Sequence, residues 1–111
     1  MIFPPQCNQT APKAEQLVYN LLKSEFSDRN QVSAFHEVRL QSIRERNREF
    51  EIDFVVVSSK FIVCIEVKGG SVKYDAGRNE WTQNGHLLTS PIQQAIDNKH
   101  AFIHRFRSDL R

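Results

Sequence analysis

The stretch DFVVVSSKFIVCIEVK, residues 53–68, decides the fold. The segments Phe50–Val57 and Phe61–Val67, which include most of it, are rich in β-branched and aromatic residues, and these favour strands. Only the polar segment 58–60 separates the two, and it is short enough only for a hairpin turn. The stretch therefore predicts two adjacent antiparallel strands.

Three charged residues stand among the apolar residues of this hairpin: Asp53, Glu66 and Lys68. A two-residue turn pairs Ser58 with Phe61, and counting outward places Asp53 directly opposite Glu66; a four-residue loop gives the same register. Side chains alternate between faces along a strand, so Lys68 shares the face of Glu66. Directly opposed Cβ atoms lie about 4.5–5.5 Å apart. We therefore expect the three charges to converge on one patch.

Two carboxylates this close repel each other and raise one pKa unless a positive charge lies beside them. The candidates are a divalent cation and the Lys68 ammonium. Ligation by oxygen alone favours Mg²⁺ or Mn²⁺ over Zn²⁺, and such an ion beside a lysine suits phosphodiester hydrolysis. The alternative is a solvated strand face with a modest ion pair. Apolar residues on the same face favour the metal site, because charges beside them need a partner.

The N-terminal part predicts a helix and a strand. Thr10 followed by Pro12 marks a helix start, and the polar segment 27–30 ends the helix. From Val32 the spacing shortens and predicts a strand, followed by an arginine-rich loop that reaches Arg48. The predicted apolar stripe of the helix consists of Ala14, Leu17, Val18, Leu21, Leu22 and Phe26.

The C-terminal part predicts a small meander and a second helix. Two glycines at 69–70 end the hairpin's second strand, and short strands at 72–74, 81–83 and 86–88 follow. Ser90 caps a helix whose first residue is proline. The predicted apolar stripe of this helix consists of Ile92, Ala95, Ile96, Phe102, Ile103, Phe106 and Leu110.

Composition is typical of one soluble globular domain spanning residues 1–111, with 40% hydrophobic and 25% charged residues. No run is long and apolar enough for a membrane span, and the first residues do not resemble a signal peptide, so we expect a cytoplasmic protein with reduced Cys7 and Cys64. A net charge of +2 does not by itself predict a nucleic-acid partner. Arginines at 39–48 and basic residues at 99–111 are interpreted as solvated faces, with a phosphate-facing surface as the alternative.

The pattern of Asp53 on one strand and Glu66-x-Lys68 on the next resembles the PD-(D/E)XK nuclease superfamily. Within it, EIDFVVVS, FIVCIEVKGG, the meander with Trp81, and SPIQQA resemble the nuclease-related domain, NERD. The likeness extends from AEQLVYNLL, which starts at Ala14, to the second helix. It implies an α/β (α+β) fold with a restriction-endonuclease-like core. That core is a central mixed β-sheet with an antiparallel β-hairpin, flanked by two helices.

By position, the resemblance implies that Asp53 and Glu66 hold Mg²⁺ or Mn²⁺, with the Val67 carbonyl as a third ligand. It implies that Lys68 is the catalytic lysine. Two further residues match family positions near the helix starts and complete the implied catalytic set: Glu15 and Gln94.

The local sequence gives little independent support for a catalytic role of Glu15 or Gln94. Glu15 is a carboxylate in a first helical turn, where the helix dipole favours it, and Gln94 lies off the apolar stripe. The chain also departs from the superfamily pattern, because Ile52 stands where a proline usually precedes the aspartate. A further core strand usually follows the second helix, so the chain is a short version, a fragment, or a domain whose sheet a second copy or another partner completes.

The function we expect is metal-dependent hydrolysis of DNA. The alternative is a catalytically idle module of the same fold that binds nucleic acid or a protein. A zinc site at His100 and His104 is a weaker hypothesis, because no glutamate follows His100 and no convincing third ligand is present. Tyr74 and Trp81 are interpreted as sheet packing, with base stacking as the alternative.

Overall fold

The computed structural model describes residues 1–26, 31–41 and 49–109. The predicted segment 27–30, the arginine-rich loop at 42–48 and Leu110 lie outside the described residues. The elements are β1 (Ile2–Phe3), α1 (Lys13–Phe26), β2 (Val32–Gln41), β3 (Glu49–Ser58), β4 (Ile62–Ile65), β5 (Val72–Asp75), β6 (Glu80–Gln83), β7 (His86–Leu88) and α2 (Pro91–Asp109).

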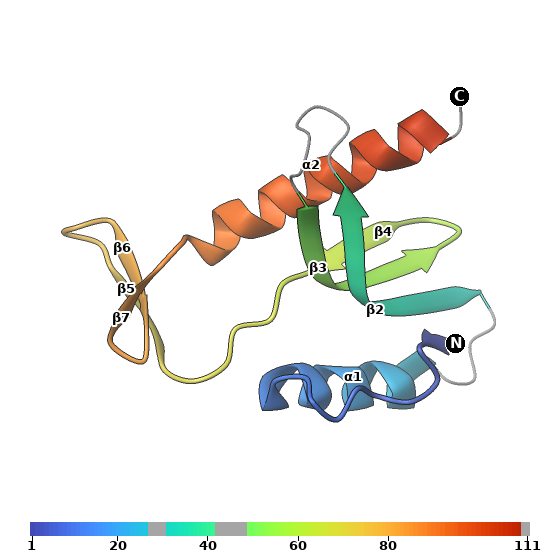
Figure 1. Ribbon diagram of the computed structural model, residues 1–111, viewed down its shortest axis with the longest axis horizontal. Coiled ribbons are helices and arrows are strands. Elements are labelled where there is room, and N and C mark those ends of the chain that lie inside the picture. The colour runs from blue at the N-terminus through green and yellow to red at the C-terminus, as the bar shows by residue number, and fades with distance from the viewer. Residues whose placement is uncertain (27–30, 42–48, 110–111) are drawn as a thin grey trace.

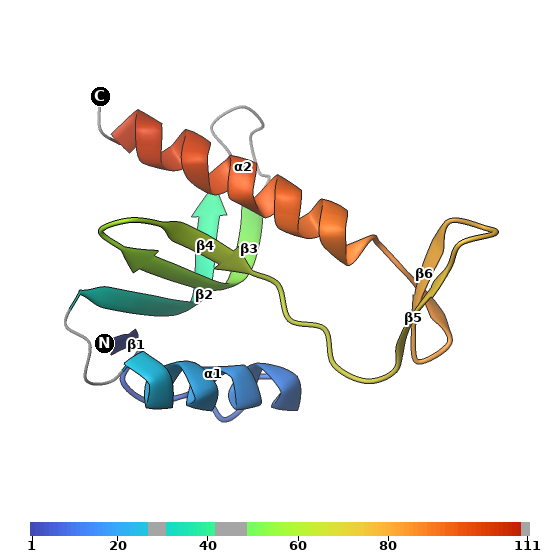
Figure 2. The same ribbon diagram turned by 180° about the vertical axis from the view of Figure 1, so that it is seen from behind.

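A four-stranded sheet in the order β1-β2-β3-β4 forms the centre of the fold. The pairs β2–β3 and β3–β4 are antiparallel, whereas β1 runs parallel to β2, so the sheet is mixed. The helix α1 lies on one side of this sheet and α2 crosses the other side (Figures 1 and 2). This confirms the predicted α+β class and the restriction-endonuclease-like arrangement.

One part of this arrangement differs from the expectation. The strand β1 was not predicted, because two residues are too few to show a period. The predicted meander is confirmed, and its strands β5, β6 and β7 form a three-stranded sheet of their own. This small sheet lies to one side of the main body, beyond the start of α2 (Figure 1).

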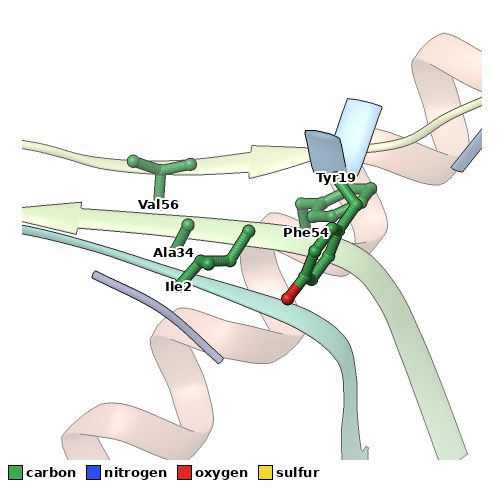
Figure 3. Close-up of a cluster of buried hydrophobic side chains, with 5 residues drawn as sticks. All are labelled: Ile2, Tyr19, Ala34, Phe54 and Val56. Atoms are coloured by element: carbon green, nitrogen blue, oxygen red, sulfur yellow. The ribbon is translucent and has the colours of Figure 1, made fainter. Parts of the chain in front are cut away.

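The main core lies between α1 and the sheet and gathers residues from four elements. Its buried members are Ile2, Tyr19, Ala34, Phe54 and Val56 (Figure 3). The Tyr19 hydroxyl donates to the Pro4 carbonyl, so this buried phenol has a partner. The N-terminal segment is therefore tied both to the sheet and to α1.

The predicted register of the hairpin is confirmed. Val57 pairs with Ile62 and Phe54 with Ile65, and the Ser58 amide donates to the Phe61 carbonyl at 2.9 Å. The second strand, however, is shorter than predicted and ends at Ile65. By counting, Glu66 still falls opposite Asp53, but Glu66 and the two residues after it lie beyond the end of β4.

Both helices begin where predicted, but their apolar stripes were partly wrong. In α1, Val18 and Leu22 pack on the core, while Leu17 and Leu21 are exposed. Each residue rotates the direction by about 100°, so a face centred on Val18 and Tyr19 leaves Leu17 and Leu21 in solvent.

In α2, the most buried described residue is the polar Asn98, whereas Ile92, Ile96 and Phe106 are exposed. The Gln93 amide donates to the Ser90 hydroxyl at 3.2 Å, as the predicted cap requires. The helix therefore turns a partly polar face toward the sheet.

We expect Phe54→Ala to lower the free energy of unfolding by about 3–5 kcal/mol, because it removes a fully buried ring from the centre of the core. Phe61→Ala is the matched control, since that ring is 49% exposed and its loss should cost less than half as much. Denaturant unfolding measures both values. Equal losses in the two variants would contradict this description of the core.

Candidate functional site

A cavity of about 340 Å³ lies where α1 begins, where β3 bends and where α2 begins. Glu51, Gly69 and Gln83 contribute to its wall. The wall also contains every residue that the sequence predicted for the site: Glu15, Asp53, Glu66, Val67, Lys68 and Gln94. Segments that lie almost 80 residues apart in the chain therefore meet in this cavity.

Asp53 occupies a position where the pairing of β2 with β3 is interrupted. His36 pairs with Phe54 and Val38 with Ile52, but the intervening Glu37 has φ 56° and does not pair with Asp53. A residue other than glycine rarely adopts such a backbone, and it bends β2 here. Asp53 therefore lies at a bend of the sheet. Its side chain is buried, with 7% of the residue exposed.

The Asp53 carboxylate also ends β4. Its Oδ2 accepts a hydrogen bond from the Val67 amide at 2.8 Å. In a continued ladder the backbone amides of this segment would bond to the neighbouring backbone, but here a side chain takes the Val67 amide. This is the physical reason why the strand is shorter than predicted, and it fixes the carboxylate next to Glu66.

The Glu66 carboxylate is held by two side chains. Its Oε1 lies 3.3 Å from the Lys68 ammonium, and its Oε2 accepts from the Asn98 side-chain amide at 3.3 Å. Asn98 also donates to the Glu51 carbonyl at 3.2 Å. This residue therefore links α2 to β3 and to the acidic site.

Glu15 approaches from the first turn of α1. Its Oε2 lies 2.9 Å from His36 Nε2, and its side chain is only 13% exposed. Ligand atoms of Glu15, His36 and Glu37 lie within 4.8 Å of one another. Sequence reasoning found Glu15 through the family pattern but missed His36.

The surroundings of Glu66 and Glu15 raise the pKa values of these two carboxylates. Burial raises the pKa of Glu66 to about 7, the charge of Asp53 adds to the rise, and Lys68 opposes it. Burial also raises the pKa of Glu15; the hydrogen bond from His36 lowers it, and the charge of Asp53 raises it. The carboxylates thus repel one another in a partly dehydrated space, where a cation is favourable.

The donor set fits a hard divalent cation. Glu15, Asp53 and Glu66 line the cavity together with Glu51. Val67, whose carbonyl is the expected third ligand, lines it too. Oxygen ligands of this kind suit Mg²⁺ and Mn²⁺. By contrast, the exposed His100 and His104 of α2 belong to no group of three or more metal-ligating side chains within the described ranges.

Asn98 is a second residue, after His36, that sequence reasoning missed. Asn98 stands between Ala95 and Phe102, at the spacing of the apolar stripe, and that position was the available signal. Gln94 lines the cavity, as the family pattern implied, although it lies off the apolar stripe. Tyr74 and Trp81 pair across β5 and β6, with ring centroids 4.9 Å apart, as sheet packing predicts.

A family model described as the nuclease-related domain matches residues 11–110. The chain belongs to the nuclease-related domain (NERD) family. No curated protein and no solved structure matches it. The NERD match begins just before α1 and reaches the end of α2, so it includes every residue of the cavity. Within the described ranges, the NERD chain has no helix long and apolar enough to cross a membrane.

The raised pKa of Glu66 predicts a pH dependence of stability without added metal. Because the folded value of about 7 exceeds the ordinary 4.5, the folded chain binds more protons than the unfolded chain between these pH values. The free energy of unfolding should therefore fall as the pH rises from about 4.5 to about 7. Denaturant unfolding in the presence of a chelator measures this slope.

Glu66→Gln should reduce the slope and raise stability at pH 7, because the amide carries no charge. Glu49→Gln, an exposed position at the start of β3, is the control and should leave the slope unchanged. A slope that is the same in Glu66→Gln and wild type would show that Glu66 does not titrate as described.

Proposed function

We propose that the chain is a nuclease domain that uses Mg²⁺ or Mn²⁺ to hydrolyse phosphodiester bonds of DNA. The observation that carries the proposal is that one cavity collects Glu15, Asp53, Glu66 and Lys68 from three separate parts of the fold. The family is nuclease-related, and the residue types suit this chemistry.

The carboxylates of Asp53, Glu66 and Glu15 hold the ion, and the Val67 carbonyl completes the set. Within the described residues, Lys68 is the cation that contacts a carboxylate of this cavity, through Glu66 at 3.3 Å. One ammonium does not balance three carboxylates, so a divalent ion lowers their mutual repulsion. When bound, it supplies positive charge at the reacting phosphate and acidifies water.

Lys68 has a distinct role in this proposal. Its side chain is 22% exposed, more than the 7% of its partner Glu66, and it lines the cavity. There it orients a water molecule and offsets the charge that develops on the phosphate. Gln94, at the start of α2, lines the same cavity and donates to the phosphate or to the water.

We propose the cytoplasm as the compartment. Cys7 and Cys64 are both free thiols, and the cytoplasm keeps thiols in that form.

The open edge of β4 supports the expected partner that completes the sheet, either a second copy or another chain. Among the described strands, β4 pairs only with β3. Phe61, Ile62 and Val63 at this edge are each more than 40% exposed. An apolar strand edge is a template for another strand, and sedimentation velocity of the whole chain shows whether a second copy supplies it.

The proposal predicts that Lys68→Met lowers the rate of DNA cleavage by about 10²–10³-fold, the usual loss when one electrostatic stabiliser is removed. Asp53→Asn should abolish cleavage and also the heat of Mn²⁺ binding in calorimetry, because it removes a ligand charge. Lys73→Met on β5 is the matched control, since Lys73 is an exposed lysine that does not line the cavity.

Two results would overturn parts of this proposal. Unchanged cleavage in both Asp53→Asn and Lys68→Met would assign the reaction to another site or to a contaminant. Mn²⁺ binding without cleavage of single- or double-stranded DNA or RNA would favour the catalytically idle binding module.

A further inference from the structure

We infer that His36 is a positioning residue that holds the Glu15 carboxylate in the cavity, and that Glu15 joins Asp53 and Glu66 at the ion only through this contact. The inference rests on the proposed function, because it concerns how the ion site is assembled. Its basis is the geometry around one buried imidazole ring.

The His36 ring is held on several sides. Its side chain is fully buried, and Nε2 lies 2.9 Å from Glu15 Oε2. The ring stacks on Phe54, with centroids 4.4 Å apart and planes 9° apart, and Tyr19 lies against it at 5.8 Å. Because Phe54 and Tyr19 belong to the central core, the ring cannot swing away from Glu15 without disturbing that core.

The hydrogen-bond partners also identify the proton that the ring carries. A carboxylate only accepts, so the bond to Glu15 requires a proton on Nε2. Nδ1 is buried without a partner within the described residues, and an unpaired buried N–H is costly. The tautomer with its proton on Nε2 therefore leaves no buried N–H unpaired, because Nε2 donates to Glu15.

Glu15 needs such a holder. Its side chain is long and begins in the first turn of α1, and the negative charge of Asp53 repels it. Without the bond to His36, repulsion would turn the carboxylate away from Asp53 and toward solvent. A second carboxylate, that of Glu37, lies 4.0 Å from the same Nε2, which is farther than Glu15. Glu37 accepts a hydrogen bond from the Asn8 side-chain amide at 3.2 Å instead.

The placement of His36 also couples Glu15 to Asp53. His36 pairs with Phe54 in the β2–β3 ladder, and Phe54 directly follows Asp53. The ring is therefore fixed by the same strand that carries Asp53. The contact between His36 Nε2 and Glu15 then holds the Glu15 carboxylate of α1 at a fixed place relative to Asp53.

The test compares His36→Gln with His36→Leu. The Gln amide nitrogen can reach the place of Nε2 and donate to Glu15, whereas Leu fills a similar volume without a donor. In calorimetric titration with MnCl₂, we expect the dissociation constant to rise about 10–100-fold in His36→Leu, the usual effect of losing a group that supports a metal ligand. His36→Gln should bind within a few-fold of wild type, and His86→Leu on β7 should match wild type.

A purely structural role for His36 would give a different result. Unchanged Mn²⁺ affinity in a folded His36→Leu, or an equal loss in His36→Gln and His36→Leu, would overturn the inference. If His36→Leu does not fold, His36→Asn replaces it, because the shorter amide does not reach Glu15. Absence of Mn²⁺ binding in the wild type would instead overturn the proposed function, and this inference with it.

A second measurement needs no metal. Long-range ¹H–¹⁵N correlation spectra of the wild type in the presence of a chelator should show His36 with its proton on Nε2. Glu15→Ala should shift this proton upfield, because the charged acceptor is lost. A proton on Nδ1, or a resonance unaffected by Glu15→Ala, would contradict the assigned pair even if Mn²⁺ binds.

Discussion

The hydrogen bond from the Val67 amide to the Asp53 carboxylate is the interaction on which the site depends. It takes the place of a bond between strands, ends β4 at Ile65 and turns the following residues toward the cavity. Because the register of the hairpin is already fixed, this turn occurs directly opposite Asp53. One carboxylate thus positions the next carboxylate and the lysine that follows it. In a longer, regular β4 those groups would follow the strand instead of closing around Asp53.

Buried charge then shapes the two helices. A carboxylate in a partly dehydrated site needs hydrogen-bond partners, and the two sides of the sheet each supply one. Asn98 of α2 donates to Glu66, while His36, covered by α1, binds Glu15. These polar residues occupy places that an apolar side chain would otherwise fill in the core. The buried face of α2 therefore includes a polar residue of the site, and Ile92 and Ile96 of the same helix are exposed.

The sequence predicted the parts of the structure that depend on local pattern and on counting. The register of the hairpin follows from the short turn between Ser58 and Phe61, and the start of α2 follows from Ser90 and the proline after it. The burial of individual residues did not follow, because it depends on how far each helix is rotated about its axis. Leu17 and Asn98 show this in opposite directions, since one is exposed and the other is buried.

The candidate site was predictable to a similar degree. Asp53, Glu66 and Lys68 are close in sequence or joined by the hairpin, so the register of the hairpin predicts that they are neighbours. Glu15 and Gln94 come from distant segments, and only the family pattern pointed to them. His36 carries no local signal, because a histidine in an apolar strand is equally consistent with ordinary packing. Its relation to Glu15 exists only once α1 lies against the sheet.

The close approach of α1 depends in turn on a single residue without a side chain. A Cβ atom on Gly69 would lie 3.0 Å from the Cβ of Ala14, which is tighter than ordinary van der Waals contact. Gly69 directly follows Lys68, and Ala14 directly precedes Glu15. The absent side chain therefore lets the segment that carries the lysine pass against the turn that carries the third carboxylate. The Gln83 side chain donates to the Gly69 carbonyl at 2.8 Å and fixes this crossing from the small sheet. The β5–β7 sheet thus helps to close the site, although it is separate from the central sheet.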